Sequence, residues 1–249
     1  TYTYCVEDNW PWLGDYDMND VVIVSRIDRM MSKDGGKVSA LTINWELRAA
    51  GTTYDIAGAV QMDKVQTSDV AGVVSSHEGF GSGAFASRGL DADSPCAVIP
   101  FFNRTEELLS ASNTWKGQPA AAIRKHTTTV TFSQPVDIAS VLDSEMNFFI
   151  ALKQRTSEIH MPGYAPTASG IIGKGSFLPS DPYKFFVTEG DQTKNNYMMW
   201  ALMIPGEFRY PAERNDIRGV YEYFMAWASS NGAEHAEWYL ESADAGRIY

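Results

Sequence analysis

The acids that precede residue 21 are the side chains best suited to chemistry in this sequence. In the segment Gly14-Asp15-Tyr16-Asp17-Met18-Asn19-Asp20, alternate side chains offer oxygen atoms that can converge on one hard cation. Calcium suits this spacing, because Ca²⁺ takes six to eight oxygen ligands in a flexible geometry. We predict a calcium site in this acidic loop. Its predicted ligands are Asp15, Asp17, Asn19 and Asp20, with Glu7 and Asp8 completing the shell.

The acidic loop is not an EF-hand, although it opens with the same spacing. An EF-hand requires Gly at the sixth position and Glu at the twelfth, and the sequence has Asp20 and Arg26 there. The residues that follow are typical of a strand. Turn capping is the alternative to metal binding, because Asp and Asn side chains readily accept hydrogen bonds from backbone amides in turns.

Three further residues are candidates for ligand binding. In strand geometry, Glu158 and His160 point to the same face, where they can form a metal or acid/base pair. The alternative is that His160 anchors a turn through a hydrogen bond to its neighbour. Trp115 lies in the polar stretch 112–118, so we expect its ring to be exposed as a stacking surface. The other histidines, at positions 77, 126 and 235, have no distinctive neighbours in the sequence.

The charge of the chain excludes two classes of partner. The formal net charge is −11 and the pI is about 4.8. Nucleic acids require a basic stripe that releases counterions, and the sequence has none. An anionic membrane surface would be repelled for the same reason, and no apolar run approaches the roughly 18 residues that cross a bilayer. We therefore expect no nucleic-acid binding and no membrane insertion, whereas a cation, a neutral glycan or a protein partner fits the acidic balance.

The sequence does not decide whether the protein is an enzyme, but it favours a non-catalytic role. Gly81-Ser82-Gly83 lacks the spacing of a serine nucleophile elbow. Glycoside cleavage needs two carboxylates roughly 5–10 Å apart. Among 31 acidic residues, the sequence singles out no such pair.

Hydrophobic periodicity predicts a mainly β fold. Leu41–Ala49 alternates strictly between apolar and polar residues, which indicates a half-buried strand, and 54–62 repeats the pattern after a stretch, 50–52, that suits a hairpin turn. The other predicted strands are Val21–Ile27, His126–Ser133, Asn147–Leu152 and Tyr197–Ile204. The apolar stripe from Ile217 to Ala228 predicts one C-terminal helix capped by Asp216.

These elements predict a single all-β domain over residues 1–249. We expect a β-sandwich, for which a jelly-roll strand order is one option. Long loops are expected at 66–126 and 161–196, and a short helix near 105–110. The two cysteines, Cys5 and Cys96, suit either one disulfide or two independent buried thiols. Residue 1 already opens a polar, aromatic segment, so any export signal or anchor is expected to lie outside the sequence shown.

Three blocks of the sequence resemble the LruC-domain family of bacterial envelope and surface proteins. The first block is 7–11 with 14–22, which is similar to the family's E-D-x-W-P and G-D-Y-D-x-N-D-V-V stretches. The second, 158–167, is similar to E-[IV]-H-L-P-G-Y-x-P-T, with Met161 in place of Leu. The third runs from Trp200 to Pro211 and is similar to the family's W-A-L-x-I-P ending. The closing helix and Trp238-Tyr239 also agree, with Glu237 in place of Asp.

The resemblance implies an exported protein, often attached as a lipoprotein, at the bacterial cell surface or outer membrane. It implies no settled activity. We expect a non-catalytic surface module for adhesion or for binding a glycan or protein ligand, with a calcium-stabilised acidic loop. A glycan hydrolase and a structural subunit of a surface assembly are the alternatives.

Overall fold

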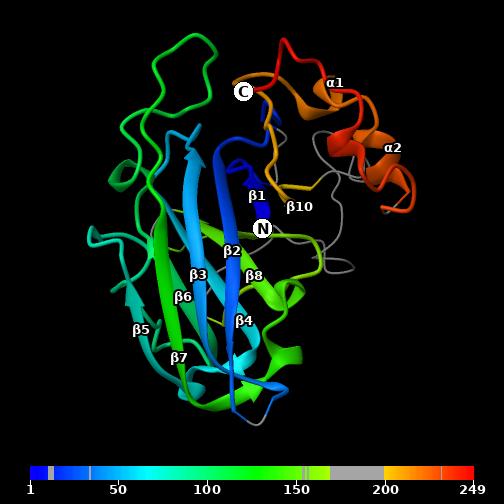
Figure 1. Cartoon of the computed structure of the whole chain (residues 1–249). Helices are drawn as coiled ribbons and strands as arrows, with labels where there is room; N and C mark the ends of the chain where they lie inside the picture. Colours follow the sequence, from blue (N-terminus) through cyan, green and yellow to red (C-terminus); the bar gives the residue numbers. More distant parts are fainter. Residues whose placement is uncertain (11–13, 34, 153–154, 156, 169–198, 231) are drawn as a thin grey trace.

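Two antiparallel sheets form the body of the molecule (Figure 1). The computed structural model describes the chain except residues 11–13, 34, 153–154, 156, 169–198 and 231. In the described part, one sheet has six strands in the order β10-β1-β2-β3-β7-β5, and the other has four in the order β6-β4-β8-β9. The strands are β1 Tyr2–Val6, β2 Val21–Met31, β3 Lys37–Ala49, β4 Ile56–Gln66, β5 Val70–Ser75, β6 Cys96–Phe102, β7 His126–Asp137, β8 Met146–Leu152, β9 Ser157–His160 and β10 Ala201–Pro205.

The predicted β-sandwich is confirmed, and alternation explains how its core forms. Leu41, Ile43 and Trp45 are buried on one face of β3, because successive side chains in a strand point to opposite faces. They belong to a large core cluster that also contains Tyr4, near the N-terminus, and Ile248, near the C-terminus. The strand order is not that of a jelly roll, because β1, β2 and β3 lie side by side as a meander.

Strand β4 is buried on both faces, so it does not alternate in polarity. One face belongs to the main core. The other face carries Ala57 and Ala59, which pack in a second small cluster with Phe85 from the loop after β5. The loop therefore covers the outer face of the four-stranded sheet at this point, which explains why the side chains of β4 on that face are apolar.

Three predictions about the segments between the main strands are wrong. Residues 50–52 were expected to form a hairpin, but β3 pairs with β2 and β7 whereas β4 pairs with β6 and β8. The segment instead carries the chain from one sheet to the other. The predicted long loop at 66–126 contains two strands, β5 and β6. The predicted helix near 105–110 is a single 3-10 turn over Thr105–Glu107.

The C-terminal region contains two short helices where one was predicted. They are α1 Ile217–Val220 and α2 Phe224–Ser229, and Asp216 caps α1 by accepting a hydrogen bond from the Arg218 N–H. The helix breaks because Tyr221 is extended and forms a β-bridge with Ala243. The β-bridge of Tyr221 thus interrupts the single helix that the apolar stripe predicted. No described helix has the length and apolar character needed to cross a membrane.

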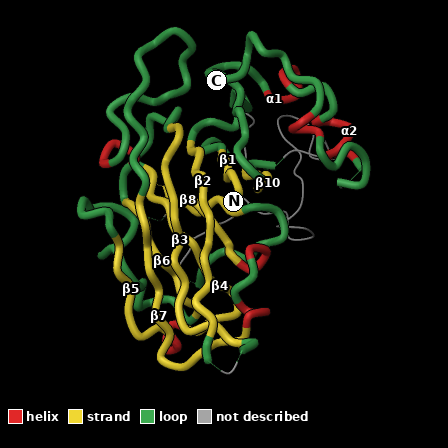
Figure 2. Tube along the Cα trace, in the orientation of Figure 1, coloured by secondary structure: helices red, strands yellow, loops and turns green. Residues whose placement is uncertain are grey.

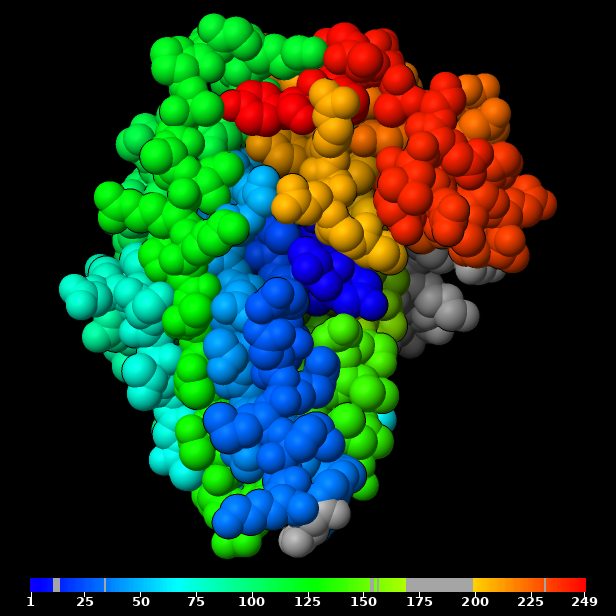
Figure 3. Space-filling model, in the orientation of Figure 1, coloured from blue at the N-terminus to red at the C-terminus, as the bar shows by residue number. Residues whose placement is uncertain are grey.

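Loops and both helices gather at one end of the sandwich (Figure 2). The orange and red C-terminal segments lie there against the dark-blue N-terminal strand (Figure 3). Strand β1 pairs with β10 on one side and with β2 on the other, so the two ends of the chain meet in one sheet. The two thiols are both free: Cys5 is buried in β1, and Cys96 is partly buried at the start of β6. Part of the predicted 161–196 loop and the start of the predicted strand 197–204 lie outside the described residues.

Candidate metal centre

The acidic loop just before β2 has an unusual backbone, and every side chain from Tyr16 to Asp20 is buried. Tyr16 and Met18 adopt left-handed conformations, with φ of 52° and 57°. Such φ values are uncommon for residues other than glycine and persist only where the surroundings impose them. Both side chains are fully buried. The Tyr16 hydroxyl donates to the carbonyl oxygen of Met199 at 2.8 Å and accepts from the Met199 N–H at 3.0 Å.

Asp17 joins this loop to the C-terminal region. Its Oδ1 accepts a hydrogen bond from the N–H of Asn19 at 3.3 Å, and its Oδ2 accepts one from the N–H of Arg214 at 2.7 Å. Burial and the neighbouring charge of Asp15 raise the pKa of the Asp17 carboxyl to about 7, against the lowering effect of the Arg214 hydrogen bond. Asp17 therefore holds the acidic loop against the segment that follows β10 through its bond to Arg214.

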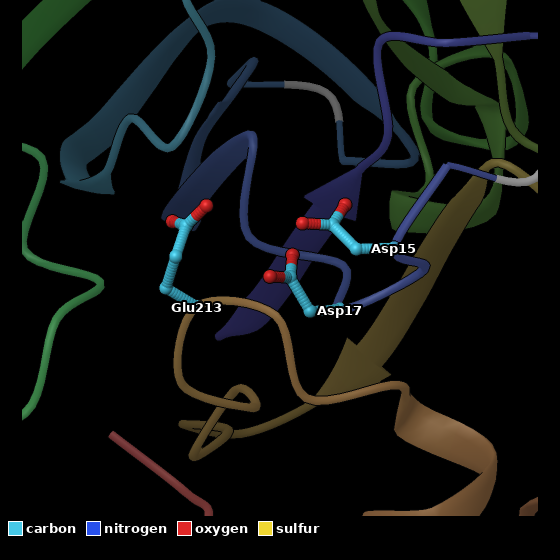
Figure 4. A group of neighbouring side chains, drawn as sticks. All are labelled: Asp15, Asp17 and Glu213. Atoms are coloured by element: carbon cyan, nitrogen blue, oxygen red, sulfur yellow. The ribbon is translucent and has the colours of Figure 1, made fainter.

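Asp15 and Asp17 face Glu213 across a narrow space. One carboxylate oxygen from each of the three residues lies within 4.8 Å of the others. Asp15 and Asp17 project from the acidic loop, whereas Glu213 comes from the segment that follows β10 (Figure 4). Glu213 Oε2 accepts a hydrogen bond from the Thr114 hydroxyl at 2.7 Å. Asp15 is exposed, so the cluster opens to solvent on its side.

Glu7 lies at the inner side of the same loop. Its carboxylate points into the loop, where it accepts a hydrogen bond from the Met18 N–H, and its second oxygen, Oε2, is buried without a hydrogen-bond partner among the described residues. Burial raises the pKa of the Glu7 carboxyl well above its ordinary value, and the charges of Asp20 and Asp17 raise it further. The raised pKa favours the neutral acid, and a buried polar atom without a hydrogen-bond partner is uncommon.

Asp8 and Asp20 form a separate pair next to Glu7. Asp20 Oδ2 accepts a hydrogen bond from the Asp8 N–H at 2.8 Å, and the Asp8 carboxylate accepts one from the Thr52 hydroxyl. Burial, followed by the charge of Asp8, raises the pKa of Asp20 to about 8. Asp20 thus accepts a backbone amide from a residue 12 positions earlier, whereas the Asp8 carboxylate accepts a side-chain hydroxyl.

The structure brings together part of the predicted ligand set and adds a residue to it. Asp15 and Asp17 meet Glu213, whereas Asp20, Glu7 and Asp8 do not join that group of acids among the described residues. The predicted ligand Asn19 is buried: its Nδ2 donates to the Pro211 carbonyl at 3.0 Å, and its Oδ1 has no partner in the described part. Sequence reasoning missed Glu213, because no local spacing connects it to a loop almost two hundred residues earlier.

The predicted Glu158–His160 pair exists, but its hydrogen-bonding capacity is filled. His160 Nε2 lies 3.0 Å from Glu158 Oε2, and His160 Nδ1 lies 2.8 Å from Asn147 Oδ1. Arg155 Nε and the Thr167 N–H and hydroxyl also donate to Glu158. Burial alone would raise the pKa of Glu158, but the hydrogen bond and charge of His160 and the hydrogen bonds of Thr167 bring it down to about 2. This network fastens the turn that follows β9.

Trp115 is exposed, as predicted, with 43% of its surface accessible. The guanidinium carbon of Arg214 lies 5.4 Å from the centre of its ring, within the range of a cation–π contact. Arg214 thus connects Trp115 to the metal centre, because its backbone N–H bonds to Asp17.

A second group of side chains was not predicted from the sequence. His77 and His126 lie edge to face with ring centres 5.0 Å apart, and His126 stacks on the buried Trp45 at 4.7 Å. His77 Nε2 lies 3.5 Å from Glu107 Oε2. The two histidines and Glu107 line a pocket of about 270 Å³ at the ends of β5 and β7. Strand register places His126 opposite Trp45, and no sequence spacing reveals His77 as its neighbour.

Comparison with known proteins identifies the family. Residues 36–239 match the model of a family described as "Domain of unknown function (DUF4842)". The chain belongs to the DUF4842 family. The matched residues include Glu213 and Trp115, whereas the acidic loop precedes them. This DUF4842 chain matches no curated protein.

A solved structure with the same fold extends the comparison. The DUF4842 chain is similar to the crystal structure described as "a Putative lipoprotein from Bacteroides ovatus", with a TM-score of 0.74 and 19% sequence identity. The match covers 100% of this chain and 74% of that chain. At this level of identity the likeness establishes the shared fold.

Proposed function

We propose that this DUF4842 chain is a non-catalytic module of the bacterial cell surface, of the LruC-domain type, that binds a glycan or protein ligand and is stabilised by calcium. The observation that carries the proposal is the convergence of Asp15, Asp17 and Glu213 on one small space. The bound ion would hold the acidic loop against the segment that follows β10.

The donor set fits a hard divalent cation. Three carboxylates within 4.8 Å repel one another strongly unless a positive charge lies between them. Calcium prefers carboxylate and carbonyl oxygens and tolerates irregular geometry. Glu7 lies on the inner side of the same loop, outside this group of three acids, and its buried Oε2 has no hydrogen-bond partner among the described residues.

The surface location is supported by two likenesses. The sequence blocks at 7–22, 158–167 and 200–211 resemble the LruC-domain family, and the solved structure with the same fold is described as a "Putative lipoprotein". An acidic chain with net charge −11 also suits a cation ligand and neutral partners better than nucleic acid or an anionic membrane.

A thermal melt tests the calcium site. The EDTA-treated protein should melt at a higher temperature when CaCl₂ is added, because an ion that binds only the folded state adds RT ln(1 + [L]/Kd) to its stability. Glu213→Gln should lose most of this rise, whereas the exposed Glu222→Gln should keep it. Glu213 is preferred to Asp17 as the probe, because Asp17 also accepts two backbone hydrogen bonds. No rise in the wild-type protein would refute the site.

The hydrolase alternative gains no support from this cluster. Glycosidases use two carboxyl groups that face each other across the scissile bond, whereas three carboxylates, from Asp15, Asp17 and Glu213, converge here on one small space. The geometry favours a shared ion over an acid and a nucleophile.

The assembly alternative has one observation in its favour, the edge strand β5. Among the described residues β5 pairs with β7 alone, it contains no charged side chain, and Val74 is 73% exposed. Uncharged, exposed edges invite pairing with another strand. If assembly is the function, sedimentation should show concentration-dependent association that Val74→Lys abolishes. A monomer at all concentrations would count against this alternative.

A further inference from the structure

Trp115 and the metal centre belong to one continuous surface. The Thr114 hydroxyl donates to Glu213, and the Glu213 N–H donates back to the Thr114 carbonyl at 3.0 Å. Arg214 bonds through its backbone to Asp17 and places its guanidinium over the Trp115 ring. We call the surface formed by Asp15, Trp115, Glu213 and Arg214, with Asp17 buried behind it, the Trp115 face.

The loop that carries Trp115 is anchored on both sides of the ring. Asn113, at a φ of 58°, donates through Nδ2 to the carbonyls of Arg48 and Ala121, each at 3.2 Å, and accepts from the Ala121 N–H at 2.6 Å. Lys116 Nζ donates to the carbonyls of Ala245 and Gly246 at 3.1 and 2.9 Å. Figure 3 shows this green segment beside the red C-terminal segment.

Anchoring matters because it explains why an exposed tryptophan is useful here. The backbone on either side of Trp115 is already ordered, so a ligand that stacks on the ring does not have to order the loop. Trp115 is 43% exposed as a residue, and the guanidinium of Arg214 lies over its ring. A rigid, amphipathic aromatic ring on an ordered loop is a good contact surface for a ligand with both apolar and polar faces.

The proposed calcium ion limits the chemistry of a ligand that also contacts Trp115. Asp15 is exposed, so an ion held by the three carboxylates faces solvent on one side and keeps coordination positions for other oxygens. A sugar supplies what both parts require: adjacent hydroxyls are hard oxygen donors, and the C–H face of the ring stacks on an aromatic side chain. A polyanion would be repelled by a chain of net charge −11.

We propose that the Trp115 face binds a neutral glycan, with one sugar ring stacked on Trp115 and its adjacent hydroxyls completing the coordination of the calcium ion. This inference rests on the calcium site of the proposed function. It goes further by assigning the ligand class, the place where the ligand binds and the dependence of that binding on calcium.

Affinity electrophoresis in gels that contain mannan, starch or xylan tests the inference. The wild-type protein should be retarded by at least one of these neutral polysaccharides when CaCl₂ is present and should migrate freely in EDTA. Trp115→Ala should lose the retardation. Leu240→Ala, which removes an apolar side chain that is 69% exposed elsewhere on the surface, should keep it.

The outcomes separate this inference from the proposed function. Absence of retardation by all three polysaccharides overturns the glycan inference, as does retardation that persists in Trp115→Ala or in EDTA. If the melting temperature still rises with calcium, the metal centre stands and only the glycan assignment fails. If calcium has no effect on melting, the proposed function fails as well. Melting of Trp115→Ala with calcium verifies that this variant folds.

Discussion

The backbone N–H of Arg214 donates a 2.7 Å hydrogen bond to Oδ2 of Asp17, across 197 positions of sequence. A second backbone bond, from the Ile217 N–H to the Tyr16 carbonyl at 2.9 Å, lies beside it. The acidic loop and the start of α1 are therefore one structural unit. A cation between Asp17 and Glu213 would reinforce a contact that the backbone already makes.

Replacing Thr128 with Val should destabilise the fold through Trp45. The buried indole Nε1–H of Trp45 donates to the Thr128 hydroxyl at 3.0 Å, and both residues are almost inaccessible to solvent. Valine keeps the shape but leaves the indole N–H without an acceptor, which costs about 1–3 kcal/mol. Urea unfolding measures the change.

Thr129→Val is the matched control, because Thr129 follows directly in β7 and lies on the opposite, partly exposed face. This substitution should change the free energy of unfolding by no more than about 0.5 kcal/mol. Equal stabilities for the two variants would contradict the importance of the Trp45–Thr128 hydrogen bond.

The stability of the protein should fall in acid partly through Glu158. The pKa of this carboxyl is about 2 in the folded state, below its ordinary value of 4.5. A lowered pKa contributes stability that is present above about pH 4.5 and is lost as the pH falls through about 2. The shift corresponds to about 3 kcal/mol. Urea unfolding at neutral pH and at about pH 3 measures the loss.

Glu158→Gln separates this effect from general acid denaturation. At neutral pH the variant should be clearly less stable than the wild type, because Arg155 and His160 lose their charged partner. The difference in free energy of unfolding between the variant and the wild type should become smaller in acid. Glu237→Gln, at an exposed position, should follow the wild type at both pH values. A difference that does not change with pH would argue against the lowered pKa.

Gly51→Ala should disturb the segment that crosses between the sheets. A Cβ at Gly51 would lie 2.3 Å from Oδ1 of Asn19 and 3.2 Å from its carbonyl oxygen. The Gly51 N–H also donates to that carbonyl, so the two segments cannot separate easily. Overpacking of this kind costs about 1–3 kcal/mol, which urea unfolding can detect.

Gly72→Ala is the control for added volume, because a Cβ there has no atom within 4 Å. It should be nearly neutral or stabilise by about 0.4–1 kcal/mol, through the lower entropy of the unfolded chain. If both alanine variants behave alike, the close approach of Gly51 to Asn19 does not limit stability.

Local patterns predicted the strands that have one buried and one polar face. The alternation in Leu41–Ala49 identified β3, because its apolar side chains meet the core on one side. Strands β1, β5 and β6 were not predicted. Strand β6 carries Pro100 within an apolar run, and β5 is a short edge strand with Gly72 inside it, so neither alternates clearly.

The partners of each element could not be predicted from local patterns. Periodicity shows which residues of β3 and β4 are buried but does not show that the two strands belong to different sheets. The same limit applies to the metal centre. Spacing within the acidic loop predicted Asp15 and Asp17, whereas Glu213 arrives through the pairing of β1 with β10, which brings the C-terminal segment alongside.

Calcium titration by isothermal calorimetry of the EDTA-stripped protein tests the central claim most directly. The wild-type protein and Glu222→Gln should each bind calcium at one saturable site. Glu213→Gln should bind at least about tenfold more weakly, since even partners beyond the direct ligands change metal affinity about 10–100-fold. Absence of binding heat in the wild-type protein, or an unchanged affinity in Glu213→Gln, would contradict a calcium site at Asp15, Asp17 and Glu213.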